Sequence, residues 1–143
     1  CFRLNITAPI WISGEVIRSN PSAKIRIVDL SSGAAYNAYS GWTAYCASKA
    51  ALRMAAMSIA EDLKEFSNLK DRNIGILEYA PGVLDTDMQQ EVRNSGKDNF
   101  PHIDKFIEMK DEGQLVPAID SAKAIMGFIE SDKVKLYEEM RYS

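Results

Sequence analysis

The sequence has 143 residues, of which 46% are hydrophobic and 26% are charged, and its 17 basic and 20 acidic side chains give a formal net charge of −3. This composition is ordinary for one soluble globular domain, and the scattered basic residues provide no clustered surface for nucleic acid or an anionic membrane. No apolar run approaches the roughly 18 residues that a membrane-spanning helix needs. We therefore expect a cytoplasmic protein that binds neither nucleic acid nor membrane.

The two cysteines and the one histidine do not indicate a disulfide framework or a metal site. Cys1 and Cys46 are too few for such a framework, and neither has the His or Cys companions that zinc needs. His102 is isolated as well, so we expect it in a loop, and we expect no metal. The chain begins with Cys1 rather than with an initiator methionine or a signal peptide, and we interpret it as a fragment that begins inside a helix.

The N-terminal part of the chain predicts a helix, a strand and a loop. Residues 2–18 repeat apolar side chains every four positions, as in a half-buried helix. Pro9 is expected to kink this helix or to mark a tolerated irregularity in it. A turn at residues 19–22 leads to an expected strand over residues 24–30 (KIRIVDL), in which Ile25, Ile27 and Val28 are β-branched. Residues 31–41 hold small and turn-forming side chains and are expected to be a loop.

The middle of the chain predicts a long helix and a buried strand. Residues 42–66 lack Gly and Pro and are rich in Ala, Leu, Met and Glu, which favours one continuous helix. Residues 73–79 (NIGILEY) are mostly apolar, as in a strand that is buried on both faces. The Ala-Pro-Gly sequence at residues 80–82 is expected to end this strand.

The last part of the chain predicts further helices and a final strand. Residues 85–116 are polar with an interrupted periodicity, which indicates one or two short helices and loops. Residues 120–130 predict another helix with Asp120 or Ser121 as its N-cap, and residues 134–140 predict the last strand. Strands that alternate with helices indicate an α/β fold with a parallel sheet. Ligands of such sheets bind beyond the carboxyl ends of the strands.

Candidate catalytic side chains follow the first predicted strand. Ser32 lies in the loop behind it, and Tyr45 and Lys49 stand four positions apart, on one face of the long helix. A tyrosine has an ordinary pKa of about 10, and a lysine ammonium beside a phenol favours the ionised form that acid–base catalysis near neutral pH requires. A serine hydroxyl can hold a carbonyl oxygen while negative charge develops on it. Taken alone, the tyrosine–lysine pair indicates a helix surface rather than a catalytic site, so the neighbouring motifs decide the interpretation.

These residues belong to an ordered series of motifs. The sequence VDLSSG contains Ser32, Tyr45 follows thirteen positions later, Lys49 comes next, and the second strand runs into APGVLDT. The series resembles the short-chain dehydrogenase/reductase family, which uses Ser, Tyr and Lys at this spacing, an Asn on the preceding helix, here Asn5, and a Pro-Gly-x-x-x-Thr segment, here residues 81–86. The resemblance covers essentially the whole chain. It implies an α/β fold that is the C-terminal part of a Rossmann-like doubly wound parallel sheet.

The resemblance also implies a role for each residue. Tyr45 would protonate the alkoxide as hydride arrives, and Lys49 would support Tyr45 and bond the nicotinamide ribose. Ser32 would orient the substrate carbonyl, and Asn5 would hold a water molecule that relays protons. The substrate would contact Ser32, Gly33, Tyr45 and Gly82. The cofactor, NADP(H), would be bound by Tyr45, Lys49, Pro81, Gly82, Leu84, Asp85, Thr86, Asp87, Met88 and Gln89.

Each motif also has a plain structural interpretation. Ser32 can be a turn former after a strand, and Asn5 can be a buried helix residue that bonds the backbone. Trp42 is expected in packing rather than against the substrate. The start of a helix can be capped by Asp85, Asp87 and Gln89.

The Gly-rich phosphate-binding turn of the family has no counterpart in the chain. The first two glycines, Gly14 and Gly33, are too far apart to form it. We therefore expect residues 1–143 to be a partial short-chain dehydrogenase/reductase domain without its N-terminal dinucleotide-binding segment. The preference for NADP(H) comes from the resemblance, because the residues that distinguish NADP from NAD would lie in that segment.

Within the family, GWTAYCASKAA and YAPGVLDTDMQQ are most similar to the sepiapterin reductases and their close relatives. The substrate would then be a small carbonyl compound, a pterin or a diketone. Sepiapterin reductases anchor the pterin through an aspartate near the C-terminus, whereas Arg141 falls close to this position and cannot accept a hydrogen bond. A reductase of benzil-like diketones that does not act on pterins is therefore an alternative.

The resemblance further implies a homodimer, in which the long helix packs against a partner through the alanine-rich face of residues 44–56. A second interpretation is a non-catalytic fragment or pseudoenzyme that serves as a binding or dimerisation module. Nucleotide binding would separate an enzyme from such a scaffold.

Overall fold

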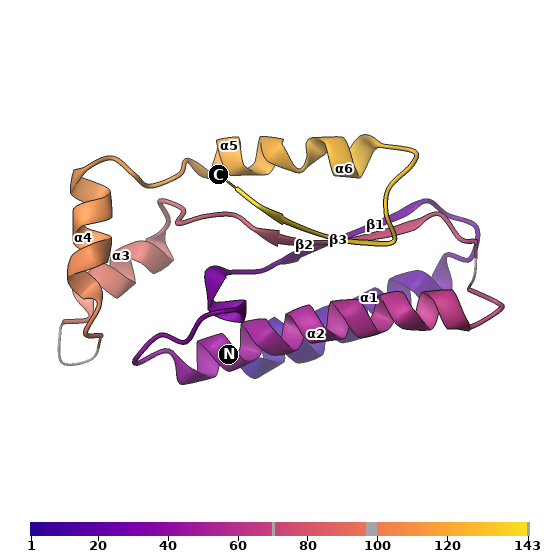
Figure 1. Ribbon diagram of the computed structural model, residues 1–143, viewed down its shortest axis with the longest axis horizontal. Helices are drawn as coiled ribbons and strands as arrows, with labels where there is room; N and C mark the ends of the chain where they lie inside the picture. The colour runs from indigo at the N-terminus through magenta and orange to yellow at the C-terminus, as the bar shows by residue number, and fades with distance from the viewer. Residues whose placement is uncertain (70, 97–99, 143) are drawn as a thin grey trace.

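The computed structural model describes residues 1–69, 71–96 and 100–142. Within these residues, three parallel strands form one sheet in the order β1 (Ile25–Leu30), β2 (Ile74–Ala80) and β3 (Tyr137–Arg141). All three strands run in the same direction, so their carboxyl ends meet at one edge of the sheet (Figure 1).

Helices cover both faces of the sheet. In chain order they are α1 (Ala8–Ser19), α2 (Thr43–Glu65), α3 (Asp87–Asn94), α4 (Ile103–Asp111), α5 (Ala118–Ala124) and α6 (Met126–Glu130). The first two lie on one face and α5 and α6 lie on the other, while α3 and α4 lie beyond the carboxyl ends of the strands (Figure 1). The expected α/β architecture, part of a Rossmann-like doubly wound parallel sheet, is thereby confirmed.

The central strand β2 is buried along its whole length, including Glu78. It has a neighbouring strand on each side and helices on each face, so a strand buried on both faces was correctly expected at residues 73–79. Alternate side chains of a strand point to opposite faces. Ile76 packs in the cluster under α1 and α2, whereas Leu77 and Tyr79 pack in the cluster under α6.

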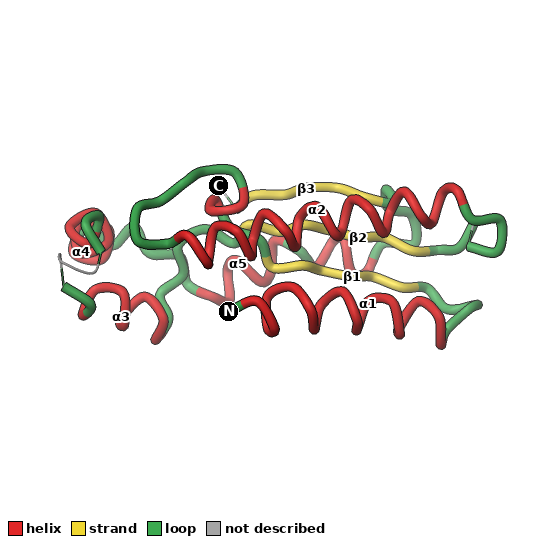
Figure 2. Tube along the Cα trace, turned by 90° about the horizontal axis from the view of Figure 1, so that it is seen from below, coloured by secondary structure: helices red, strands yellow, loops and turns green. Residues whose placement is uncertain are grey.

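The long helix predicted over residues 42–66 is α2. Its buried side chains recur every three or four positions, at Leu52, Ala56, Ala60 and Leu63, which is the spacing of one helix face. The alanines on this face let the helix approach the sheet closely, and α1 lies beside α2 on the same side (Figure 2).

The irregularity expected at Pro9 is a π-helical turn. This turn covers Arg3–Thr7 and leads directly into α1. Pro9 has no N–H to donate to the carbonyl of Asn5, and the N–H of Ala8 bonds the carbonyl of Arg3, five residues earlier. The turn therefore adjusts the backbone around Asn5, the predicted catalytic residue of this N-terminal segment.

The single helix predicted over residues 120–130 is wrong, because the structure has two helices, α5 and α6. The chain leaves the α-helical pattern at Ile125, whose N–H bonds the carbonyl of Ala122, three residues back. After this break Phe128 packs against Leu77 and Tyr79. The helix is thus interrupted at Ile125, and the second helix packs Phe128 on the sheet.

The N-cap predicted at Asp120 or Ser121 is also wrong. The helix begins earlier, after Pro117, and has no side-chain cap. Ser121 is buried, its hydroxyl donates to the carbonyl of Pro81 (3.0 Å), and it lies 2.8 Å from the hydroxyl of Tyr79. This serine therefore links α5 to the end of β2 instead of starting a helix.

The last strand begins three residues later than the predicted range 134–140. Val134 packs against Gly75 on β2, where a Cβ atom would collide with the valine side chain and lie 3.2 Å from Phe128. Pairing starts only with Leu136, whose carbonyl accepts from the N–H of Ile76 (2.9 Å). A glycine near the start of β2 thus makes room for the segment that enters β3.

The polar segment at residues 85–116, for which one or two short helices were expected, forms two, α3 and α4. Its ends are held together by a bridge between Leu84 and Val116, and the N–H of Val116 bonds the carbonyl of Val83 (2.9 Å). His102 lies in the turn before α4, as expected. Among the described residues, no helix combines the length and apolar content that crossing a bilayer requires.

Candidate active site

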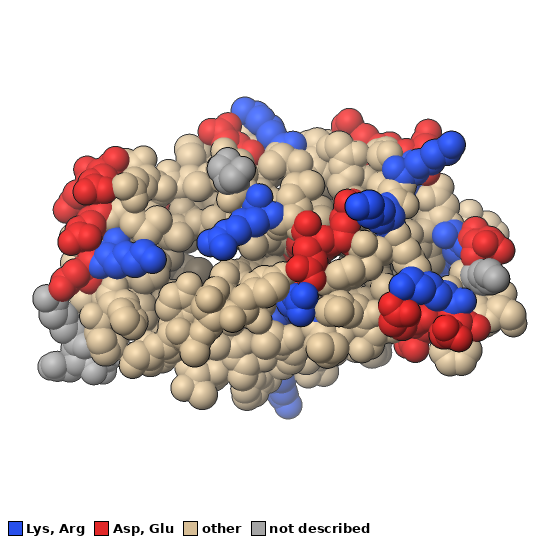
Figure 3. Space-filling model, viewed as in Figure 1, with Lys and Arg blue, Asp and Glu red and all other residues tan. Residues whose placement is uncertain are grey.

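A cavity of about 710 Å³ lies beyond the carboxyl ends of the strands. It is bordered by the loop after β1, the start of α2, the segment after β2, and α4. Most of the predicted site residues line it: Asn5, Ser32, Gly33, Tyr45, Lys49, Pro81, Gly82, Leu84, Thr86, Met88 and Gln89. In the space-filling view, Lys and Arg side chains lie on both sides of a hollow between the α3–α4 end and the rest of the molecule (Figure 3).

The two serines after β1 bond different partners. The hydroxyl of buried Ser31 donates to Glu78, on the side of the sheet that α2 covers. Ser32 is extended and stands at the start of a short 3-10 turn, where its Oγ accepts from the N–H of Ala34 (3.2 Å). Ser32 therefore serves as the turn former that composition suggested and also lies at the cavity.

Tyr45 and Lys49 project from the first turns of α2. The Lys49 Nζ donates to the carbonyl of Leu30 (2.7 Å) and lies 5.7 Å from the centre of the Tyr45 ring. Burial lowers the pKa of Lys49, and the nearby charge of Asp29 acts in the opposite direction. The lysine thus ties the helix to the end of β1 and places a cation beside the tyrosine.

Asn5 connects the π-helical turn to α2. Its Nδ2 donates to the Oγ of Ser48 (3.0 Å), and the Ser48 hydroxyl donates to the carbonyl of Tyr45 (2.8 Å). Ser48 is fully buried, and it precedes Lys49 directly in the sequence of α2. The asparagine is therefore bonded to a side chain rather than to backbone, and it lines the cavity from the side of α2.

An aromatic cluster forms one wall of the cavity. Trp42 stacks on Phe100 with ring centres 4.8 Å apart, and it meets Tyr45 edge to face at 5.4 Å. The ring centres of Tyr39 and Phe106 lie 5.6 Å and 5.7 Å from the ring centre of Trp42. Trp42 is therefore a packing residue, as expected, and it also borders the cavity that holds the tyrosine.

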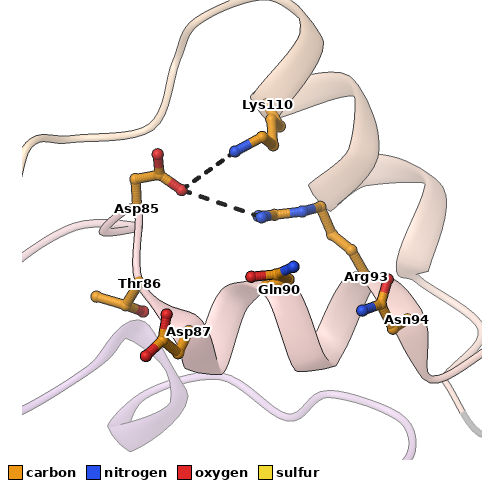
Figure 4. Close-up of a pocket in the computed structure, with 7 residues that line it drawn as sticks. All are labelled: Asp85, Thr86, Asp87, Gln90, Arg93, Asn94 and Lys110. Atoms are coloured by element: carbon orange, nitrogen blue, oxygen red, sulfur yellow. Dashed lines mark hydrogen bonds and ion pairs between the residues drawn. The ribbon is translucent and has the colours of Figure 1, made fainter.

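Two predicted cofactor residues, Asp85 and Asp87, lie outside this cavity. They line a smaller polar pocket of about 490 Å³ between α3 and α4, which they share with Thr86 (Figure 4). Asp85 pairs there with Lys110 (3.4 Å) and Arg93 (4.0 Å). Thr86 borders both spaces and connects them.

The segment after β2 has two features that fit a bound nicotinamide cofactor. Gln89 is buried, and its Oε1 has no hydrogen-bond partner in the part of the chain that the structure describes. Buried acceptors are normally satisfied, so this atom is available to an amide donor in the cavity. Gly82 has a positive φ of 81°, a conformation that favours glycine, and it leaves the cavity wall without a side chain at that point.

Several cavity residues were not singled out from the sequence as site residues. They are Leu30, Ser31, Tyr39, Ala80, Val83, Lys105, Phe106 and Met109. Phe106 and its neighbours lie on α4, in the segment whose periodicity was too interrupted to orient a helix. For these α4 residues, the one signal in the sequence was that they follow β2, the strand that leads into the site.

A row of carboxylates crosses the sheet beside the cavity. Asp29, Glu78 and Glu139 are register partners on β1, β2 and β3. Arg53 from α2 lies over them, 2.7 Å from Glu139 and 3.5 Å from Glu78. Burial, followed by the charge of Glu78, raises the pKa of Asp29 to about 6, while the charge of Lys49 opposes the rise. The row therefore holds a carboxylate that titrates close to neutral pH.

This elevated pKa predicts a pH-dependent stability. An unfolded aspartate has a pKa of about 3.9, so between about pH 4 and 6 the folded chain binds a proton that the unfolded chain does not. The free energy of unfolding should fall as the pH rises through this window, and Asp29→Asn should remove that fall. In the full-length polypeptide that contains this chain, we expect the variant to be more stable than wild type by about 2–3 kcal/mol at pH 8, with no such gain at pH 4.

Urea unfolding of wild type and variant across this pH range measures the effect. Asp62→Asn, on the exposed surface of α2, is the matched control and should change the free energy of unfolding by less than about 0.5 kcal/mol. An equal stability difference for Asp29→Asn at pH 4 and pH 8 would contradict the assignment.

Comparison with known proteins points to the family that the motifs resemble. The profile of the family described as short chain dehydrogenase matches residues 1–97. A benzil reductase ((S)-benzoin forming) of Bacillus cereus is 34% identical over 140 residues, which are 96% of this chain and 55% of that protein. A sepiapterin reductase of Bos taurus is 31% identical over 134 residues, which are 91% of this chain and 46% of that protein.

Solved structures agree with this result. The KRED1-Pglu enzyme is similar with a TM-score of 0.78 at 26% identity, over 96% of this chain and 56% of that chain. A short-chain dehydrogenase from Streptomyces avermitilis has the same fold, with a TM-score of 0.61 at 19% identity over 97% of this chain and 50% of that one. The chain spans about half the length of the curated relatives it matches. Because the family profile matches more than half of its residues, this chain belongs to the short-chain dehydrogenase family.

Proposed function

We propose that the protein is an NADPH-dependent carbonyl reductase of the sepiapterin reductase type, which reduces the ketone of a small molecule. One observation carries the proposal: Tyr45, Lys49 and Ser32 border the same cavity at the carboxyl end of the sheet. Reduction of a carbonyl needs a proton donor and a hydrogen-bond donor at one oxygen. The similarity to proteins named benzil reductase and sepiapterin reductase supports a reaction of this type.

The segment after β2 is proposed to hold NADP(H). The orphaned Oε1 of Gln89 would accept from the nicotinamide amide, and Gly82 would let the ring approach the backbone. Pro81, Leu84, Thr86 and Met88 would surround it from the cavity, and the pocket beside them would place Asp85 and Asp87 near its phosphate side. Bound there, the cofactor would supply a hydride to the carbonyl carbon.

The side chains of this chain would handle the proton. Tyr45 would donate its phenolic proton to the substrate oxygen as the carbonyl becomes an alcohol, and the Lys49 ammonium would stabilise the phenolate left behind. The hydroxyl of Ser32 would donate a hydrogen bond to the same oxygen. Asn5 would hold the water through which Tyr45 regains its proton, since the asparagine lines the cavity and is fixed by Ser48.

We also propose that two copies associate through α1 and α2 in the cytoplasm. These helices expose large apolar side chains that a single copy leaves uncovered, including Trp11 and Ile12 on α1 and Met54 on α2. Ala47 and Ala50 are exposed on the same part of α2, where small side chains would let a partner helix approach closely.

The test is NADPH oxidation by the full-length polypeptide that contains this chain, with benzil and sepiapterin supplied separately. Turnover of sepiapterin would support the pterin reductase, and turnover of benzil alone would support a diketone reductase with the same chemistry. If neither compound is reduced while NADPH still binds, the reductase proposal is wrong and a binding module is favoured.

A further inference from the structure

Arg141 stands at the end of β3, beside the proposed substrate position. The structure places its guanidinium next to Gly33, which directly follows Ser32: a Cβ atom on Gly33 would lie 3.8 Å from the terminal nitrogen of Arg141 and 3.6 Å from the hydroxyl of Tyr39. Both side chains line the cavity. Two hydrogen-bond donors, one of them charged, therefore flank the loop that is proposed to orient the carbonyl.

The guanidinium has no counter-charge nearby. None of the described carboxylates lies within ion-pairing distance of Arg141, whereas Arg53 on the same side of the molecule pairs with Glu139. The described residues that border the cavity include Lys49, Lys105 and Arg141 but no aspartate or glutamate. A cavity of this kind favours a negatively charged guest, because a positive field raises the local concentration and affinity of anions.

The position of Arg141 distinguishes substrate from cofactor. Apart from Tyr45 and Lys49, the residues proposed to hold NADP(H) follow β2, whereas Arg141 ends β3 and adjoins the loop that follows β1. The rest of the cavity wall is largely aromatic or aliphatic, including Trp42, Phe106 and Met109, which suits the apolar part of a small organic molecule. The charged group that Arg141 recognises would then be carried by the substrate.

We infer that the substrate is a ketone that also carries a carboxylate, and that Arg141 and Tyr39 bind this carboxylate while Ser32 and Tyr45 meet the ketone. Arginine presents a planar fork of donors that matches a carboxylate, and the tyrosine hydroxyl adds a further donor. The inference rests on the proposed reductase activity and adds the class of substrate, an aryl or alkyl keto acid.

The experiment compares two substrates that share a skeleton and differ in charge, phenylglyoxylate and its methyl ester. With the full-length polypeptide and NADPH, kcat/KM is measured for both compounds in wild type, Arg141→Gln and Arg141→Lys. The ester is the more reactive ketone, but comparing the acid-to-ester ratio between variants cancels this difference. We expect Arg141→Gln to lower the ratio about 10- to 100-fold, the value of a charge-assisted hydrogen bond, and Arg141→Lys to lower it less.

The matched control is Arg18→Gln, since Arg18 is an exposed arginine at the end of α1, remote from the carboxyl ends of the strands. The acid-to-ester ratio should be unchanged in this variant. If the ester is reduced but Arg141→Gln leaves the ratio unchanged, the inference is wrong and the reductase proposal stands. A larger dissociation constant for NADPH in Arg141→Gln than in wild type would show that the arginine binds the cofactor, and this result would also overturn the inference. If the acid, the ester, benzil and sepiapterin are all inert, the reductase proposal itself fails.

Discussion

Replacing Tyr45 by phenylalanine is expected to lower kcat by about 10²- to 10⁴-fold, the usual contribution of a positioned proton donor. Only the phenolic oxygen is lost, so the ring keeps its edge-to-face contact with Trp42 and the wall of the cavity stays intact. NADPH oxidation with benzil by the full-length polypeptide measures the loss. A fluorescence titration should give a dissociation constant for NADPH close to that of wild type.

Tyr142→Phe is the matched control for this substitution. The Tyr142 side chain packs against β2 and lies outside the described lining of the cavity, so kcat should change little. A Tyr45→Phe variant that retained near wild-type kcat would show that another group supplies the proton. A loss of turnover together with loss of NADPH binding would indicate damage to the site rather than removal of an acid.

Replacing Glu78 by alanine is expected to lower the free energy of unfolding by about 3–5 kcal/mol, as for other buried ion pairs that lose one partner. Glu78 is 1% exposed and accepts hydrogen bonds from Ser31 and from the hydroxyl of Tyr137 (2.9 Å), with Arg53 at 3.5 Å. Removing the carboxylate leaves the buried hydroxyl of Ser31 without its acceptor, takes one of two carboxylates from Arg53 and Tyr137, which still contact Glu139, and opens a cavity in the sheet layer. Urea unfolding of the full-length polypeptide measures the change.

Two further variants separate charge from packing at this position. Glu78→Gln keeps the shape and the hydrogen-bonding capacity and should cost less than alanine, while Glu65→Gln on the exposed end of α2 should cost less than about 0.5 kcal/mol. If Glu78→Ala lowers the free energy of unfolding by less than about 1 kcal/mol, water replaces the carboxylate. The row of carboxylates across the sheet then does not stabilise the fold.

The fold was predictable where one local signal dominated. The Gly-free and Pro-free stretch at residues 42–66 and the apolar stretch at residues 73–79 gave α2 and β2 because burial and propensity agreed there. The helix over residues 120–130 was wrong because Phe128 packs on the sheet, a contact that helical propensity does not contain. The N-cap at Ser121 failed for a similar reason, since that hydroxyl bonds Tyr79 and Pro81.

The candidate site was predictable from spacing in part only. The four-residue spacing of Tyr45 and Lys49 places both on one helix face, so their proximity needed no knowledge of the sheet. The partners of Glu78 come from the loop after β1, from α2 and from β3, and one glutamate in an apolar strand gives no sign of them. Arg141 likewise acquires its neighbours Gly33 and Tyr39 only when β3 is added to the sheet.

The two consecutive serines after β1 restrict how this segment can change. Ser31 bonds Glu78 within the sheet layer, and Ser32 faces the cavity and starts the 3-10 turn. Inserting or deleting one residue before them would exchange these two directions, as a slipped strand exchanges its faces. Loops usually tolerate changes in length, but here the segment after the turn is fixed as well, because Tyr36 bonds Glu139 and Tyr39 lines the cavity. Engineering of substrate range in this segment therefore calls for single substitutions that keep its length rather than for loop grafting.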